Sequence, residues 1–171
     1  AYAFNRETGK PLWPIVEKKV PASKIPGEKL AKTQPFPTKP KPYDMQGLTH
    51  DDLIDFTPEL REKAIKAVSE YEIGPLFLPP LHRDNKQGLK GSLWCPGDGG
   101  GTNIDGPAAA DPVSGILYVT SKKACTSRLM APGAERDAIE PKQTGTTIAQ
   151  YAALRGQGVR GPDDLPLFKP P

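Results

Sequence analysis

The sequence lacks any long apolar run and has only two cysteines among its 171 residues. A membrane-spanning helix needs about 20 consecutive apolar residues, so none is predicted. The first ten residues also lack the charged and then apolar pattern of a secretory signal. Cys95 and Cys125 are too few for a disulfide scaffold or a zinc site, which leaves a single disulfide or two free thiols as the alternatives.

Hydrophobic residues are also scarce, at 36% of the chain, whereas 21 prolines and 17 glycines are abundant. Proline removes a backbone donor and fixes φ, which disfavours helical bundles and doubly wound sheets. The net charge of +3 is mild, and the lysines between Lys10 and Lys41 are spread among prolines rather than aligned on one face. Nucleic acid binding is therefore disfavoured, and the predicted fold is mainly β with many loops.

Helical spacing of apolar residues predicts a helix over about residues 58–71. Thr57 offers a hydroxyl for its N-cap, and Gly74-Pro75 closes it. Shorter helices are predicted at residues 50–54 and 146–154. Strands are predicted at residues 91–95 and 116–120, since the second segment is β-branched, aromatic and bounded by turn residues.

The first residues contain a hairpin pattern, Ala3-x-Asn5-x-x-Thr8-Gly9-Lys10-x-x-Trp13. A polar side chain opens the turn, glycine supplies the positive φ that it needs, and a tryptophan returns on the second strand. The pattern resembles the tryptophan-docking motif of quinoprotein propeller blades; a simple hairpin with a buried tryptophan is the alternative. Either interpretation predicts that Trp13 is buried against a neighbouring sheet, and truncation of a fully buried ring costs about 3–5 kcal/mol.

A weaker copy of this turn is Asp111-Pro-Val-Ser-Gly115-Ile-Leu-Tyr118. Two such units about a hundred residues apart fit two blades separated by an insertion. The proline-rich stretch between them resembles the excursion of glucose- and polyol-type quinoprotein dehydrogenases, and it contains the segments VPASKIPGE, TQPFPTKP, DLIDFTPEL and GPLFLPP in that order. The resemblance covers roughly residues 1–121, with a further match at LPLFKPP near residue 165.

The glycine-rich segment PGDGGGTNIDGP, residues 96–107, does not complete a phosphate-binding motif, because no Gly-Lys-Ser/Thr ending follows. In the quinoprotein family the matching segment is a glycine run ending in an asparagine that lies against the quinone. The resemblance therefore assigns Asn103 as a cofactor-binding residue, with the glycines allowing close approach of the backbone to a flat ligand. Ile104 departs from the tryptophan that usually follows, and a plain glycine-rich blade turn is the alternative.

No metal ligand or catalytic residue is assigned. Asp98 and Asp105 flank the glycine-rich turn, but calcium needs six to eight oxygen ligands. His50 and His82 have no serine or cysteine placed to form a catalytic pair, so they are interpreted as surface residues.

Four segments are predicted from these patterns. Residues 1–13 form a blade hairpin, residues 14–90 a proline-rich insertion with the helix at about 58–71, and residues 91–121 the glycine-rich turn with blade strands. Residues 122–171 form a loop-rich stretch leading to a next blade. The resemblance thus implies an internal fragment of a β-propeller, and we expect the natural chain to extend upstream of Ala1.

The function implied by the resemblance is oxidation of an alcohol or sugar hydroxyl by a calcium-activated pyrroloquinoline quinone (PQQ). We expect this chain to lack most of the active site, to bind no cofactor by itself, and to need the remaining blades or a second copy to be stable. A periplasmic location is also implied, and an oxidising compartment favours a Cys95–Cys125 disulfide, with buried free thiols as the alternative. The competing functions are a non-catalytic propeller scaffold and a disordered proline-rich interaction segment, the second of which the predicted helix and strands oppose.

Overall fold

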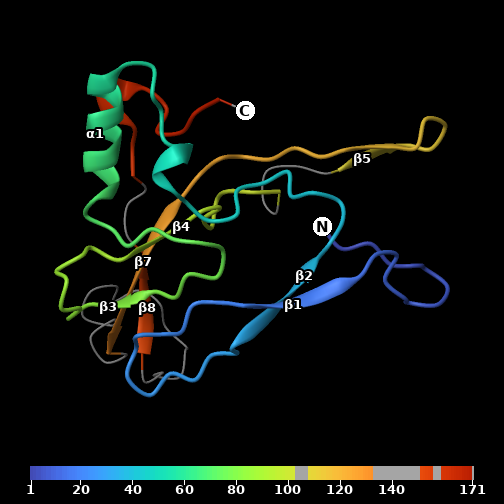
Figure 1. Cartoon of the computed structure of the whole chain (residues 1–171), viewed down its shortest axis with the longest axis horizontal. Coiled ribbons are helices and arrows are strands. Elements are labelled where there is room, and N and C mark those ends of the chain that lie inside the picture. The colour runs from blue at the N-terminus through green and yellow to red at the C-terminus, as the bar shows by residue number, and fades with distance from the viewer. Residues whose placement is uncertain (103–107, 133–150, 156–158, 171) are drawn as a thin grey trace, which may run out of the picture.

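The computed structural model describes residues 1–102, 108–132, 151–155 and 159–170. The chain is mainly β, as predicted, with short strands joined by long loops (Figure 1). None of the helices in these ranges is long and apolar enough to cross a membrane. The strands are β1 (Ile15–Lys19), β2 (Thr33–Pro37), β3 (Leu81–His82), β4 (Ser92–Trp94), β5 (Ala109–Asp111), β6 (Ile116–Tyr118), β7 (Thr126–Pro132) and β8 (Tyr151–Arg155), and the helices are α1 (Pro58–Val68) and two 3-10 turns, His50–Asp52 and Pro162–Asp164.

The largest sheet is built around β7, the longest strand. One edge of β7 pairs antiparallel with β4, placing Trp94 opposite Thr126, and then parallel with β3, placing Leu81 opposite Leu129. The other edge pairs antiparallel with β8 along five residues. The strand predicted at residues 91–95 is therefore confirmed as β4. Its pairing with β7 brings together the two ends of the chain segment that contains the glycine-rich turn.

The buried core lies between this sheet and α1 (Figure 1). The residues after Gly161 return to it, because Ile54 N–H donates to Leu167 O at 3.0 Å and Lys169 N–H donates to Asp52 O at 3.0 Å. The core thus joins parts of the chain that lie far apart in sequence. Its buried members are Leu48, Leu53, Ile54, Ala64, Val68, Leu93, Cys95 and Leu167.

The helix predicted at about residues 58–71 is present as α1, which begins at Pro58 as predicted and ends earlier than predicted. Thr57 Oγ1 accepts a hydrogen bond from Leu60 N–H at 3.3 Å, which satisfies one of the free donors of the first turn. The helix ends at Val68 rather than at residue 71 because the following backbone pairs with another segment. Glu72 N–H donates to Gly91 O at 2.9 Å, and Leu93 N–H donates to Glu72 O at 2.8 Å.

The helix predicted at residues 146–154 is wrong where the structure describes it. Residues 151–155 form strand β8, whose backbone completes the free edge of β7. A sheet edge offers a row of unpaired backbone donors and acceptors, and pairing with that edge outweighs a weak local preference for helix. Residues 146–150 lie outside the described ranges. The short helix predicted at residues 50–54 is present as the 3-10 turn His50–Asp52.

The two predicted hairpin turns share one geometry. In the first, Gly9 N–H donates to Asn5 O at 2.8 Å, and in the second, Gly115 N–H donates to Asp111 O at 2.9 Å. Both glycines have φ of +69°, a conformation that residues with a Cβ rarely adopt. In each turn the opening side chain accepts hydrogen bonds from the next residues, and the Ser114 hydroxyl and Val113 N–H lower the pKa of Asp111 in this way. The second turn is therefore a structural copy of the first.

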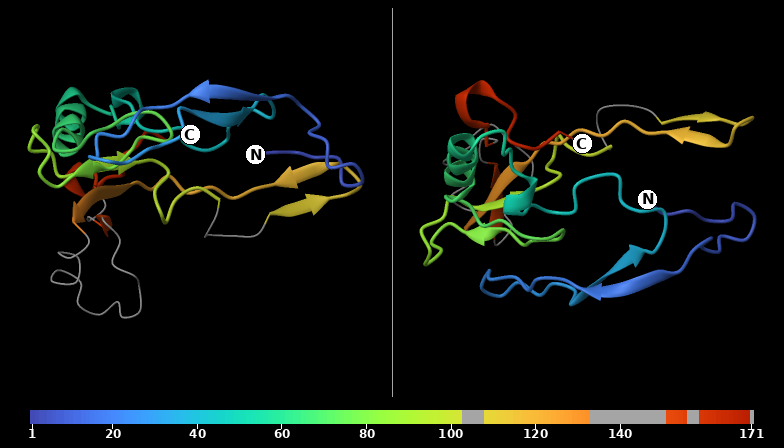
Figure 2. Two further views of the ribbon diagram at one scale, coloured as in Figure 1. Left: turned by 90° about the horizontal axis from the view of Figure 1, so that it is seen from below. Right: turned by 45° about the horizontal axis from the view of Figure 1, so that its top comes forward.

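The prediction that Trp13 is buried is wrong for this chain, because its side chain is 37% exposed. The hairpin before it lies far from α1 and from the sheet around β7 in Figures 1 and 2. The neighbouring Phe4 and Leu12 are exposed as well. A two-stranded ribbon has no second layer to enclose an indole ring, so the cost expected for truncating a fully buried tryptophan does not apply here.

The proline-rich excursion is extended, as predicted, but it also pairs with itself. Strands β1 and β2 form an antiparallel ribbon that places Ile15 opposite Pro37 and Glu17 opposite Pro35. Proline has no N–H to donate, which restricts it to strands with a free edge. The ribbon provides such an edge, and it lies over the loop that precedes β3.

Candidate functional site

The two cysteines form a disulfide between residues that lie opposite each other. Cys95 directly follows β4 and Cys125 directly precedes β7, so the bond continues the antiparallel register of the two strands. Their Cα atoms are 4.6 Å apart, the spacing of a pair without mutual backbone hydrogen bonds. Of the two alternatives left by the sequence, the disulfide is the one that the structure shows.

Beyond the disulfide, the glycine-rich turn pairs with the segment that leads into β7. Gly97 N–H donates to Ala124 O at 2.8 Å. Gly101 N–H donates to Lys122 O at 2.9 Å, and Lys122 N–H donates back to Gly101 O at 3.1 Å. The turn therefore extends the antiparallel pairing of β4 with β7, mainly through backbone hydrogen bonds.

The glycines of this turn differ in what surrounds them. A Cβ on Gly97 would lie 2.4 Å from Thr126 N, and one on Gly100 would lie 2.5 Å from Ala124 O. A Cβ on Gly99 would meet nothing within 4 Å. At positions 97 and 100 glycine thus allows close approach of the protein's own backbone, and the predicted approach of this segment to a flat ligand stays a prediction.

This difference gives a matched pair of substitutions. We expect Gly97→Ala to lower the free energy of unfolding by about 1–3 kcal/mol, because the new methyl group overlaps backbone that cannot move independently. Gly99→Ala, in the same turn, should change it by less than about 0.5 kcal/mol. Urea unfolding of both variants measures the difference. Equal losses would show that the close approach at Gly97 is not what requires glycine there.

A charged cluster anchors the start of the turn to β7. Arg128 forms an ion pair with Asp98, and its side chain is only 11% exposed. The guanidinium also lies over the Trp94 ring, 5.8 Å from the ring centroid, where the face of an indole attracts a cation. Asp98 N–H donates to Thr126 Oγ1 at 3.1 Å. The Asp98 carboxylate is therefore paired with an arginine, and its backbone N–H with a hydroxyl of β7.

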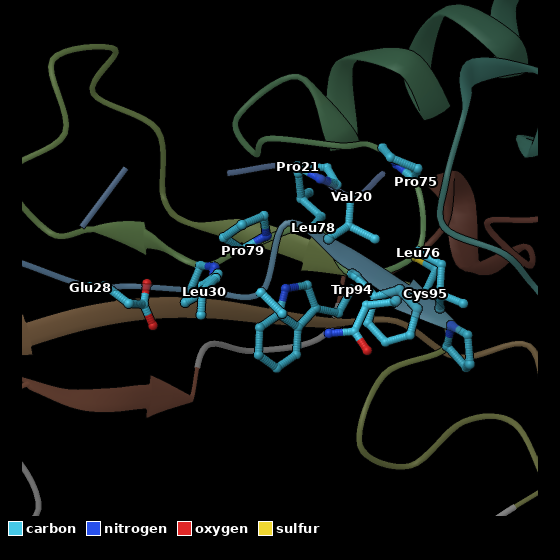
Figure 3. A pocket seen from close by; sticks show the side chains of 15 residues that line it. Val20, Pro21, Glu28, Leu30, Pro75, Leu76, Leu78, Pro79, Trp94 and Cys95 are labelled. Carbon is cyan, nitrogen blue, oxygen red and sulfur yellow. The ribbon is translucent and has the colours of Figure 1, made fainter. Parts of the chain in front are cut away.

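An apolar cavity of about 390 Å³ lies between the excursion and the end of β4 (Figure 3). Its two walls are joined by an edge-to-face contact of Phe36 with Phe77, whose centroids are 5.7 Å apart, and by the Lys24–Glu72 ion pair. Trp94 forms part of the floor. The lining residues are Val20, Pro21, Glu28, Leu30, Ala31, Gln34, Pro75, Leu76, Phe77, Leu78, Pro79, Pro80, Trp94, Cys95 and Pro96.

Cys95 lines this cavity, whereas His50, His82 and Asp98 do not. Asn103 and Asp105 lie outside the described residues. His82 Nδ1 accepts from Asp84 N–H at 3.1 Å in a surface turn, and His50 lies in an exposed 3-10 turn. Within the described ranges, no group of three or more histidine, cysteine or acidic side chains could hold a metal ion.

Sequence reasoning missed the cavity and the Arg128–Asp98–Trp94 cluster. Trp94 was visible only as a strand residue, and Arg128 lies in a stretch with no clear pattern. The register of β4 against β7 brings them together. The one available signal was the pair of cysteines, Cys95 and Cys125, on either side of the glycine run.

A mainly β chain with two repeated hairpin turns and a glycine-rich connection between paired strands fits part of a β-propeller. The chain belongs to the PQQ family described as glucose/ethanol/alcohol dehydrogenase, beta-propeller domain, whose model matches residues 1–171. The predicted family is therefore confirmed.

A curated relative shows how much of such a protein this chain represents. Over 122 residues the chain is 30% identical to the quinate/shikimate dehydrogenase (quinone) of Acinetobacter baylyi. The match covers 71% of this chain and 14% of that relative. No solved structure is significantly similar to the chain.

The cavity does not fit the quinone that the family name implies. Pyrroloquinoline quinone is flat and carries carboxylates, which call for cationic side chains or several hydrogen-bond donors. Glu28 is the only charged residue among those that line the cavity, and its charge is negative. Arg128 is already engaged with Asp98. This cavity therefore does not form a quinone site by itself.

Proposed function

We propose that this chain contributes part of the propeller of a PQQ-dependent dehydrogenase that oxidises hydroxyl groups of alcohols or sugars. The observation that carries the proposal is the family match along the whole chain, residues 1–171. The name of the similar A. baylyi enzyme gives quinate and shikimate as its substrates. Both compounds carry hydroxyl groups on a ring, which supports a polyhydroxylated substrate for the complete protein.

In this proposal the chain does not carry a complete active site. A site that binds a cofactor and orients a substrate needs several groups held in register by a rigid surround. The apolar cavity has no cationic lining residue, and the described residues contain no group of three or more histidine, cysteine or acidic side chains that could hold a metal ion. Calcium, the catalytic base and most quinone contacts then come from other parts of the complete protein, and Asn103 is the residue of this chain proposed to contact the quinone.

The disulfide supports a periplasmic location for the complete protein. Disulfides persist in oxidising compartments and are rare in the cytosol. Cys95 and Cys125 are bonded in this fold, which agrees with the location proposed from the family.

The test compares the chain with the complete protein. We expect the chain, mixed with PQQ and calcium, to show no dye reduction with alcohols, sugars, quinate or shikimate above the rate of free cofactor. The complete protein treated in the same way should turn over at an ordinary enzymatic rate. Turnover by the chain alone would contradict the proposed division of the site, and a complete protein without quinone-dependent turnover would favour a propeller scaffold instead.

A second measurement tests the role of Asn103. Asn103→Ala in the complete protein should weaken reconstitution by PQQ about tenfold or more if one hydrogen bond to the cofactor is lost. Gly99→Ala is the matched control in the same turn, because it adds a methyl group in open space. Equal PQQ affinity of the Asn103→Ala variant and the unchanged protein would remove Asn103 from the site.

A further inference from the structure

One polar group of the apolar cavity has no partner. The Trp94 Nε1–H is buried, and within the described residues it meets no hydrogen-bond acceptor. Buried donors are normally hydrogen-bonded, because an unpaired donor loses its bonds to water without replacement. Trp94 lines the cavity, and Figure 3 shows its ring among the lining side chains, with the indole nitrogen on the edge nearer to Pro79. The donor is therefore available to an acceptor placed in the cavity.

The position of this indole is fixed from several sides. The Arg128 guanidinium lies 5.8 Å from the ring centroid. The backbone of Trp94 pairs with Thr126 of β7, and the next residue, Cys95, is bonded to Cys125. A donor held in this way loses little freedom when a ligand binds, which favours affinity.

The walls of the cavity are anchored as well. Ser92 Oγ donates to Pro79 O at 2.7 Å, which ties the segment of residues 75–80 to β4. The contact of Phe36 with Phe77 joins this segment to the excursion on the opposite side. Small-molecule sites are typically preformed and enclose about 300–1,000 Å³. The cavity, at about 390 Å³, is large enough to be such a site.

The lining favours a neutral and largely apolar ligand. Five of the lining residues are prolines, which have no backbone N–H to offer. Apart from Glu28, Gln34 and Trp94, the lining side chains are apolar. The Glu28 carboxylate accepts a hydrogen bond from the Ser23 hydroxyl, and burying a ligand anion near it without a cation is unfavourable.

We propose that this cavity binds a neutral, largely apolar small molecule whose carbonyl oxygen accepts a hydrogen bond from Trp94 Nε1–H. The apolar body of the ligand packs against the surrounding leucine and proline side chains, among them Leu30, Leu78 and Pro79. Burial of that surface supplies most of the affinity, and the indole donor supplies the selectivity for a carbonyl. Binding requires neither PQQ nor turnover, so the inference does not rest on the proposed function.

Two probes of nearly the same shape test the role of the indole donor in the complete protein. Methyl β-naphthyl ketone carries a carbonyl oxygen, and β-isopropenylnaphthalene has a CH₂ group in its place. By equilibrium dialysis, we expect Trp94→Phe to weaken binding of the ketone about three- to tenfold and to leave the hydrocarbon unchanged, because one hydrogen bond is lost. Comparing the two variants cancels the different hydrophobicity of the probes. Trp13→Phe is the matched control, because Trp13 does not line the cavity.

A second pair of variants tests where the probes bind. Ala31 lines the cavity and Ala22 does not, and both are exposed. Ala31→Trp should weaken both probes about tenfold or more, because its ring occupies the space that they need. Ala22→Trp should leave both affinities unchanged. A third probe, β-naphthoate, should bind about tenfold or more weakly than the ketone, because its carboxylate has no cation to meet.

Several results would overturn the proposal. Ketone binding that Trp94→Phe leaves unchanged would show that the indole donor is not used, and probe binding that Ala31→Trp leaves unchanged would place the probes elsewhere. Failure of both neutral probes to bind the complete protein would show that another segment covers the cavity. Naphthoate binding as tight as that of the ketone would contradict the selection of a neutral ligand.

Should Trp94→Phe fail to fold, NMR of the indole N–H signals in the unchanged protein replaces it. One indole proton should then move downfield with the ketone and not with the hydrocarbon, and no such difference would overturn the proposal. Because no assay of dehydrogenase activity enters, failure of this site and failure of the proposed function remain distinguishable.

Discussion

Leu53→Ala is expected to lower the free energy of unfolding by about 2–5 kcal/mol. Leu53 is fully buried in the core cluster, and its backbone forms a bridge with Phe168 of the returning C-terminal segment. Removing its side chain leaves a cavity that the neighbouring elements cannot fill without losing their own hydrogen bonds. Chemical denaturation followed by tryptophan fluorescence measures the loss.

Leu117→Ala is the matched control for this prediction. Leu117 is 62% exposed on β6, so the same truncation should change the free energy of unfolding by less than about 0.5 kcal/mol. A loss for Leu53→Ala as small as that of Leu117→Ala would show that the core described here does not stabilise the chain.

Arg128→Met is expected to cost about 2–3 kcal/mol, because it leaves the Asp98 carboxylate without its main partner and removes the cation over Trp94. Breaking a fully buried ion pair costs about 3–5 kcal/mol. The expected value lies lower because the Asp98 side chain is 34% exposed and water can solvate part of its charge. Thermal or urea unfolding provides the measurement.

Two controls isolate the cause of this loss. Lys63→Met breaks the ion pair with Asp163, in which both side chains are more than half exposed, and should cost only about 0–1 kcal/mol. Asp98→Asn combined with Arg128→Met should recover part of the stability, since no unpaired charge remains. A double variant less stable than Arg128→Met would contradict this explanation.

Local patterns were the part of the fold that could be predicted from sequence. The Asn5–Gly9 and Asp111–Gly115 turns and the Thr57 cap each depend on bonds between residues at most four positions apart. Such features are decided by the type of residue at each position, so the sequence shows them directly. The same holds for β6, which follows a turn and contains a β-branched and an aromatic residue, Ile116 and Tyr118.

Long-range pairing could not be predicted in this way. Residues 151–155 become a strand because β7 offers a free edge, and α1 ends at Val68 because the next residues pair near Gly91. The prediction that Trp13 is buried failed for the opposite reason, since burial depends on a second layer that the described residues do not place over it. In each case the deciding partner lies more than 10 residues away or is not described.

The candidate site likewise combines features that were visible in the sequence with features that depend on long-range pairing. The glycine run and the two cysteines were visible as residue types, and the disulfide was one of the alternatives they allowed. The Arg128–Asp98 pair depends instead on the register of β4 against β7, which no local pattern encodes. Asn103 was proposed from family resemblance and remains a prediction.

The C-terminal packing has a consequence for the order in which the protein is made. Leu167 joins a core whose other members lie between Leu48 and Cys95, so the ribosome must add more than 70 residues after Cys95 before that core can close. Until then Leu53 and its neighbours lack one wall and remain open to contacts with other nascent chains or with chaperones. Contacts of such wide sequence separation also slow folding. Maturation of this region is therefore expected to begin only after residue 168 has been synthesised.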